Sequence, residues 1–200
     1  MPESLSVSVR LLVLGVGLTL WLTQYFIINN IAEPARPRVK SGMAIDEWIP
    51  FIPQFMIVYL STYVFGPLPF VLICDTSLFI RTTIAYMSIA LVCSTIHVLY
   101  PSQIQRPEFT GNKSISWSLI TWFQRICKPY GNFPSTHVAF SVLSVSSGFA
   151  VGGPVLGNIF LIWAGMIAMS TLVAKQHYLL DVIVGGGLGI GAAFLIGLAA

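Results

Sequence analysis

Long apolar stretches recur along almost the whole chain, and this feature limits its fold most. A helix needs about 20 mostly apolar residues to span a bilayer. Only 8% of the 200 residues are charged, against about 25% in an ordinary soluble domain. So few charges could not cover a soluble monomer, and disordered segments are polar and charge-rich. The composition therefore predicts a polytopic membrane protein with one domain over residues 1–200.

Six such stretches predict an all-α bundle of six transmembrane helices. They cover about 9–31, 49–73, 78–100, 134–151, 155–173 and 178–200. The first is longer than a signal-peptide core and no small-residue cleavage site follows it, although a cleaved signal is the alternative. Prolines in the second stretch predict kinks, and Gly152-Gly153-Pro154 predicts a tight turn after the fourth.

The longest polar stretch, 101–133, joins the third and fourth spans. Within it, residues 114–126 set apolar side chains among polar ones, which predicts a short amphipathic helix in the membrane interface. A helix that caps the bundle is the alternative. Six spans put both termini on one side, so the loops after the first, third and fifth spans share the opposite face. Almost every polar candidate lies on these three loops.

Two histidines and a carboxylate dominate the C-terminal part of the chain. Between residues 129 and 200 the only charged side chains are Lys175 and Asp181, and the only histidines are His137 and His177. Charges near a bilayer are costly, so each is a functional candidate. His177 and Asp181 are one helical turn apart. A carboxylate bound to one ring nitrogen leaves the other free to react. The alternative is a structural pair that closes the turn between the fifth and sixth spans.

The neighbouring polar residues favour an anion. Pro134 at a helix start leaves first-turn N–H groups that attract anions, and Ser135 and Thr136 add hydroxyls, although ordinary capping is the alternative. Arg106 adds a cation, although a lone Arg often reaches to lipid head groups. Two histidines and a carboxylate could also indicate a metal, but Arg106 and Lys175 would repel one and attract a phosphate. The pattern favours phosphoryl transfer through a histidine, with no metal and no cofactor.

Other classes of protein fit less well. Ten Lys and Arg residues spread over the chain do not form the basic face that nucleic-acid binding needs. Cys74, Cys93 and Cys127 show neither a disulfide framework nor metal-ligand spacing. A transporter would have charges at bilayer depth, whereas here they gather at one end. The expected partners are a lipid phosphate substrate and membrane lipids; the sequence does not indicate an oligomeric state.

Short motifs between residues 99 and 185 resemble those of the type 2 phosphatidic acid phosphatase family, which shares its core with vanadium haloperoxidases. The middle motif of that family, Pro-Ser-Gly-His, corresponds to residues 134–137, with Thr136 in place of glycine. The last motif is Ser-Arg, five residues, His, three residues and Asp. It corresponds to Ser170–Asp181, with Thr171 in place of arginine.

The first motif of the family, Lys, six residues and Arg-Pro, is half present. Arg106-Pro107 stands in its place, and Leu99 replaces the lysine. The versions at 133–137 and 175–181 resemble the divergent branch with inositol-phosphoryl and phosphocholine sphingolipid transferases.

The resemblance implies a role for each candidate. His177 would be the nucleophile that forms a phosphohistidine, Asp181 would orient it, and His137 would protonate the leaving oxygen and then activate water or an alcohol. The phosphoryl oxygens would be bound by Arg106, Ser135, Thr136 and Lys175. Lys175 would replace the missing arginine if the fifth span stays helical that far, because it lies one turn after position 171. A lysine that anchors the end of the span to lipid head groups is the alternative. His97 and Ser170 could line the pocket, with a buried structural histidine as the alternative for His97.

The expected activity is therefore a metal-independent hydrolysis of lipid phosphate monoesters. The alternative is a phosphotransferase that moves a phosphorylated head group onto a lipid alcohol through the same histidine. Eight of the ten Lys and Arg residues lie on the face with the candidate site, which by the positive-inside rule would be cytoplasmic. The family usually has this face outside the cytoplasm, and we adopt the extracytoplasmic face as the prediction.

Overall fold

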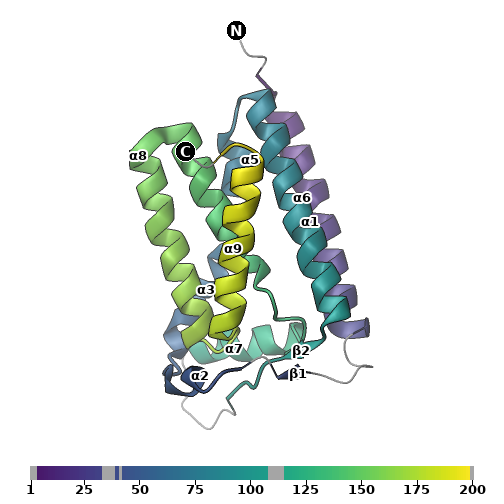
Figure 1. Ribbon diagram of the computed structural model, residues 1–200, viewed down its shortest axis with the longest axis vertical. Helices are drawn as coiled ribbons and strands as arrows, with labels where there is room; N and C mark the ends of the chain where they lie inside the picture. The colour runs from purple at the N-terminus through teal and green to yellow at the C-terminus, as the bar shows by residue number, and fades with distance from the viewer. Residues whose placement is uncertain (1–3, 33–38, 41, 108–114, 199–200) are drawn as a thin grey trace.

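The computed structural model describes residues 4–32, 39–40, 42–107 and 115–198, and most of these residues are helical. The long helices lie side by side with roughly parallel or antiparallel axes (Figure 1). They are α1 (Val7–Ile27), α6 (Thr76–Leu99), α8 (Thr136–Val173) and α9 (Leu179–Leu195). Four helical stretches of the described chain are long and apolar enough to cross a membrane, and α9 is a shorter apolar helix. The expected all-α membrane protein is confirmed at this level.

The second predicted span is a series of short helices, as its prolines indicated. It consists of η3 (Pro53–Phe55), α3 (Met56–Leu60), α4 (Thr62–Phe65) and α5 (Leu68–Leu72). The predicted start at residue 49 is wrong, because a proline disfavours helical backbone in the residue before it. Ile49 and Ile52 precede Pro50 and Pro53, and both have extended backbone angles.

The tight turn expected in the middle of the C-terminal half is present inside α8. Gly152 and Gly153 have non-helical angles there, and Gly153 has a φ of 59° and a ψ of −154°, a conformation open to glycine. The ribbon reverses its direction at this point (Figure 1). α8 is therefore two antiparallel helical arms, which correspond to the predicted spans 134–151 and 155–173.

Small residues let α9 approach the first arm of α8 very closely. A Cβ atom added at Gly189 would lie 2.6 Å from the carbonyl oxygen of Ala139, and one added at Gly185 would collide with the carbonyl oxygen of Ser135. Glycines one turn apart permit such close backbone contact between helices. The backbone N–H of Ser135 donates to the carbonyl of Asp181 at 3.0 Å, so this approach joins the starts of α8 and α9.

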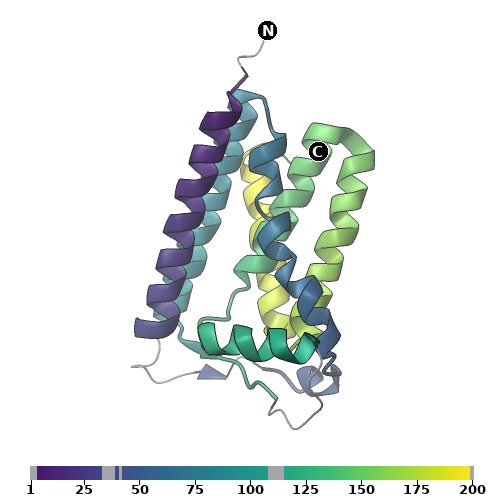
Figure 2. The same ribbon diagram turned by 180° about the vertical axis from the view of Figure 1, so that it is seen from behind.

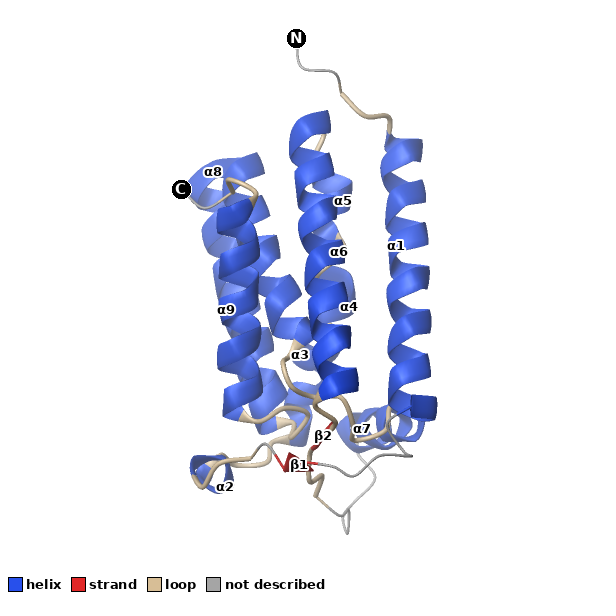
Figure 3. Ribbon diagram, turned by 45° about the vertical axis from the view of Figure 1, so that its right-hand side comes forward, coloured by secondary structure: helices blue, strands red, loops and turns tan. Residues whose placement is uncertain are grey.

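Several short elements gather at the end of the bundle opposite to the start of α1. Helix α7 (Ile115–Ile126) lies across this end (Figure 2). Strands β1 (Val39–Lys40) and β2 (Ser102–Gln103), which are parallel, lie at the same end (Figure 3), as does α2 (Ile45–Trp48). The π-helix η1 (Ile28–Ala32) continues α1 towards them. The amphipathic helix expected at 114–126 is therefore present, apart from residue 114, which lies outside the described residues.

Apolar clusters stabilise the bundle, and two of them lie towards its opposite ends. One cluster, with Phe79, Tyr86 and Leu143, fills the end near the start of α1. The other fixes α7 to the bundle, because Ile120 and Phe123 pack against the buried Met56 of α3. The opposite side of α7 leaves Ile115 and Trp122 exposed.

Candidate active site

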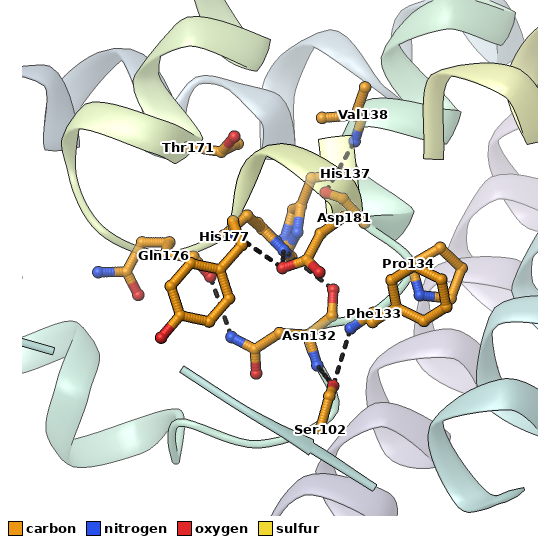
Figure 4. Close-up of polar contacts among 12 residues, drawn as sticks. Ser102, Asn132, Phe133, Pro134, His137, Val138, Thr171, Gln176, His177 and Asp181 are labelled. Carbon is orange, nitrogen blue, oxygen red and sulfur yellow. Dashed lines mark hydrogen bonds and ion pairs between the residues drawn. The ribbon is translucent and has the colours of Figure 1, made fainter. Parts of the chain in front are cut away.

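The two histidines of the C-terminal half face each other at the end of the bundle that carries α7. His137 lies in the first turn of α8 and His177 lies just before α9, and their ring centroids are 5.8 Å apart (Figure 4). Both side chains line a cavity of about 380 Å³, a volume that includes its open mouth. Its walls come from α1, α3, α6, α7 and the loops between them, and include Trp21, Tyr25, Tyr59, His97, Arg106, Phe123, Lys128, Asn132, Thr136 and Gln176.

The His177 ring is held by two acceptors on its Nδ1 atom. Nδ1 lies 3.0 Å from the carbonyl oxygen of Asn132 and 3.5 Å from Oδ2 of Asp181. Because both neighbours can only accept, the proton of the neutral ring is assigned to Nδ1. Nε2 then has a lone pair and is the reactive nitrogen, which is what a nucleophilic histidine requires.

Asp181 also starts helix α9. Its Oδ2 accepts the backbone N–H of Tyr178 at 2.9 Å, in a capping box. The side chain is fully buried, and Oδ1 has no hydrogen-bond partner among the described residues. The spacing of four residues between His177 and Asp181 thus produces the predicted contact. The two residues do not share a helix turn, because α9 begins after His177.

His137 is surrounded by aromatic rings. Its Nε2 atom lies 3.5 Å from the hydroxyls of both Tyr59 and Tyr63, which are long contacts for hydrogen bonds. Trp21 of α1 approaches it edge-on, with ring centroids 6.2 Å apart. These neighbours shield one side of the ring and leave the side towards His177 for a substrate group.

The start of α8 differs by one residue from the prediction. Ser135 is the N-cap, and its hydroxyl accepts the N–H of Val138 at 3.4 Å. Pro134 therefore precedes the cap, and its expected place as the first helical residue is wrong. Ser135 is fully buried, whereas Thr136 lines the cavity. Of the first-turn residues of α8, Thr136 and His137 line the cavity with N–H groups that the Ser135 cap does not bind.

Arg106 is the predicted cation that the structure does bring to the cavity. Its Nη1 donates to the carbonyl of Cys127 at 2.7 Å, and its Nε is buried with no partner among the described residues. Burial lowers the pKa of this guanidinium from its ordinary value. Desolvation of this kind strengthens the attraction of an arginine for an anion. Lys128, which sequence reasoning did not select, also lines the cavity.

Lys175 is placed elsewhere, and the expectation that the fifth span stays helical through it is wrong. α8 ends at Val173, and Lys175 has a positive φ of 52°. Its ammonium donates to the carbonyls of Asp46 at 2.9 Å and Ile49 at 2.6 Å, and it is not among the residues of the cavity wall. Burial lowers the pKa of Lys175, and Asp46 opposes this. The lysine joins two loops beside the site.

Of the two further residues predicted to line the pocket, the structure brings one to the cavity and not the other. His97 lines the cavity, and its Nε2 lies 3.1 Å from the carbonyl oxygen of Pro134. Ser170 is fully buried, donates to the carbonyl of Ile167 and is outside the cavity wall. Thr171, at the position of the family's arginine, is also fully buried and donates to the carbonyl of Ala168.

Sequence reasoning missed the residues that act through the main chain or come from distant helices. Asn132 contacts His177 through its carbonyl, which no side-chain pattern reveals. Its position just before the middle motif was the one available signal. Trp21 and Tyr25 reach the cavity from α1, and both precede His137 by more than a hundred residues in the chain.

The family model of the PAP2 superfamily matches residues 55–199. The chain belongs to the PAP2 superfamily. The match includes His97, Arg106, His137, His177 and Asp181, and membership indicates phosphatase- or phosphotransferase-type chemistry on membrane lipid phosphates. No curated protein and no solved structure matches the chain. In this PAP2 protein, α1 lies outside the matched residues, although it contributes Trp21 and Tyr25 to the cavity.

The donor set of the described chain does not include a group of three or more His, Cys, Asp and Glu side chains arranged for a metal ion. Instead, the carboxylate of Asp181 is directed at His177, and cations from Arg106 and Lys128 line the same cavity. This combination suits a negatively charged ligand.

Proposed function

We propose that this PAP2 protein is an integral-membrane lipid-phosphate phosphohydrolase that works through a phosphohistidine on His177. One observation carries the proposal: His177 has its Nδ1 bound by acceptors and faces His137 across a cavity that Arg106 also lines. A nucleophile, an acid–base group and an anion-binding cation thus meet in one place, as phosphoryl transfer requires.

The reaction then has two halves. Nε2 of His177 attacks the phosphorus, the P–O bond to the lipid breaks, and protonated His137 gives its proton to the leaving oxygen. A water molecule next loses a proton to His137 and attacks the phosphorus, so the P–N bond breaks and phosphate leaves. The Asp181 carboxylate and the Asn132 carbonyl stabilise the positive charge on the ring of His177 during both halves.

The oxygens of the transferred group would be bound by groups of the chain itself. Arg106 and the N–H groups of Thr136 and His137 in the first turn of α8 would take this role, because these three residues line the cavity. With these donors present, the reaction has no need of a divalent cation.

An apolar crevice supports a lipid as the carrier of the phosphate. It runs between α1, α5, α6 and α8, reaches His137, and is lined by Val13, Leu14, Leu18, Phe70, Met87 and Phe140 among others. An acyl chain in this crevice would place the phosphate at its polar end, beside the histidines. Trp21 lines both the crevice and the cavity.

The membrane arrangement is part of the proposal. The two arms of α8 and the helix α9 complete six crossings, α7 lies in the interface, and the site faces the side away from the cytoplasm. Glu47 is exposed at the site end, and Cys74 is exposed near the opposite end. A membrane-impermeant maleimide added to intact cells should label Glu47→Cys in a Cys74→Ser background. Labelling of Cys74 in the unaltered protein with none at position 47 would reverse the orientation.

A phosphotransferase is the second candidate, and a second crevice favours it. This crevice lies between α1 and α7 and is lined by Leu22, Phe26 and Trp122, and it shares Tyr25 and Phe123 with the cavity. A second lipid there could supply an alcohol in place of water in the second half of the reaction.

The deciding experiment uses the purified protein with several lipid phosphates, with and without a diacylglycerol or ceramide acceptor. Release of free phosphate supports the hydrolase, and an acceptor-dependent product supports the transferase. Both require His177, so His177→Ala should abolish turnover and the acid-labile phosphoenzyme. Near-normal turnover of folded His177→Ala would refute the phosphohistidine mechanism.

A further inference from the structure

Three consecutive backbone N–H groups converge on Ser102, beside the proposed nucleophile. The N–H groups of Asn132 and Phe133 both donate to Oγ of Ser102 at 3.0 Å (Figure 4). The N–H of Gly131 donates to the carbonyl of Ser102 at 3.1 Å. Ser102 is fully buried and is not among the residues of the cavity wall. It therefore binds the loop before α8 without a place to touch a substrate.

One peptide unit links this serine to His177. The carbonyl that accepts Nδ1–H of His177 belongs to the peptide between Asn132 and Phe133. The N–H of that same peptide donates to Ser102 Oγ. The hydroxyl thus holds one end of the peptide plane while the other end binds the ring. Hydrogen bonds in series polarise one another, so this serine strengthens the acceptor that His177 sees.

The distances indicate which partner sets the direction of the ring. Nδ1 is 3.0 Å from the Asn132 carbonyl and 3.5 Å from the Asp181 carboxylate. A normal N–H···O bond has a donor–acceptor distance of about 2.9–3.0 Å. The carbonyl therefore fixes the tautomer and the ring plane, whereas the carboxylate acts mainly through its charge.

Two contacts fix the backbone around Ser102 and the loop that it binds. Ser102 begins β2, which pairs with β1 in register with Val39. The side-chain Nδ2 of Asn132 donates to the carbonyl of Gln176 at 3.0 Å, which ties the loop to the residue before His177. The peptide that receives His177 is thereby fixed relative to the backbone that carries His177.

We infer that Ser102 is a positioning residue, which fixes the Asn132–Phe133 peptide so that its carbonyl orients His177 for attack on phosphorus. The inference rests on the proposed role of His177. Because Ser102 does not line the cavity, its loss should lower kcat and leave KM for the lipid phosphate unchanged.

The test uses Ser102→Ala, Asp181→Asn and their combination in the full-length purified protein, with Ser147→Ala as the matched control. Ser147 is equally buried, and its hydroxyl binds only the carbonyl of Leu143 within α8. Each maximal rate is divided by the concentration of folded enzyme to give kcat. Ser102→Ala should reduce kcat by about 2- to 10-fold, the range expected for the loss of a hydrogen bond between neutral groups, and Ser147→Ala should not reduce it.

The combination gives the sharper readout. Asn132 and Asp181 hold the same N–H group, so each partly covers the loss of the other. The kcat of the double variant should therefore be at least about fivefold lower than the product of the two single-variant effects predicts. If the two residues had independent roles, the fold-losses in kcat would simply multiply. If Ser102→Ala does not accumulate in folded form, Ser102→Cys takes its place in the same cycle, because a thiol is a weaker acceptor.

The outcomes separate this inference from the proposed function. If His177→Ala is inactive and the kcat losses of Ser102→Ala and Asp181→Asn simply multiply in the double variant, the positioning role alone is overturned. An unchanged kcat in the Ser102 variants would overturn it in the same way. An active His177→Ala would overturn the phosphohistidine proposal, and this inference with it.

Discussion

Replacing Asp181 by asparagine tests how much of the reaction depends on charge rather than on orientation. The carboxylate oxygen lies 3.5 Å from Nδ1 of His177, and the two side chains are 0% and 7% exposed. At an effective dielectric constant of about 20, a unit charge at this distance contributes about 5 kcal/mol. Asparagine keeps an oxygen for the Tyr178 N–H and leaves its NH₂ at the position of Oδ1.

The carbonyl of Asn132 still orients the ring in this variant. The positive charge of the ring is shared between its two nitrogens, and only Nδ1 lies at the short distance, so we assign about 3–4 kcal/mol to the lost charge. This corresponds to a fall in kcat of about 10²- to 10³-fold, because each 1.36 kcal/mol is a factor of about ten. KM should change little, since Asp181 is behind the histidine and outside the cavity wall. The assay is phosphate release from a lipid phosphate in detergent micelles, with single-turnover formation of the phosphoenzyme.

Asp46 provides a matched control for the helix cap. It is also a buried carboxylate at the start of α9, where its Oδ1 accepts the N–H of Leu179 at 2.8 Å and its Oδ2 accepts the N–H of Met43 at 2.7 Å. Asp46→Asn removes a charge from the same helix start without touching His177, so kcat should stay within about threefold. If both variants fell alike, or if Asp181→Asn stayed within threefold, the electrostatic account would be refuted.

Three further predictions follow from particular contacts. Lys175→Met removes hydrogen bonds to two carbonyls outside the cavity. Its kcat and KM should stay near normal, and thermal unfolding should show a free energy of unfolding lower by about 1–2 kcal/mol. A hundredfold loss of kcat/KM at unchanged stability would return Lys175 to the site. Gly185→Ala collides with the Ser135 carbonyl and should destabilise the α8–α9 contact by about 1–3 kcal/mol, whereas Gly187→Ala, with no atom within 4 Å of the added Cβ, should be neutral or slightly stabilising in the same thermal assay. A chelator should leave phosphate release within about twofold, and rescue by a divalent ion would contradict the metal-free mechanism.

The sequence predicts the helices well where local chemistry decides them. Prolines at 50 and 53 and glycines at 152 and 153 interrupt the apolar pattern, and the backbone departs from the helix at these places. The spacing of His177 and Asp181 also gave a true contact. These features depend on residues that are near in sequence, so their physical effect is visible without the fold.

The contacts that escaped prediction depend on the exact path of the backbone. Lys175 was expected one turn beyond position 171, but the chain leaves the helix at residue 173 and adopts a left-handed conformation at 175. A lysine in a sequence does not indicate a left-handed backbone, as a glycine or an asparagine would. The Asn132 carbonyl likewise belongs to the main chain, and every residue has one, so its contact with His177 required the loop geometry fixed by Ser102.

The departures from the family motifs have a physical consequence for the charge of the cavity. Leu99, in the place of the lysine, is 76% exposed at the end of α6, and Thr171, in the place of the arginine, is fully buried within α8. Neither lines the cavity, so the cations there come from Arg106 and Lys128 instead. One nitrogen of Arg106 is already bound to the Cys127 carbonyl. A phosphoryl group in this site would therefore depend more on hydrogen bonds from the start of α8, where Thr136 and His137 line the cavity and carry first-turn N–H groups.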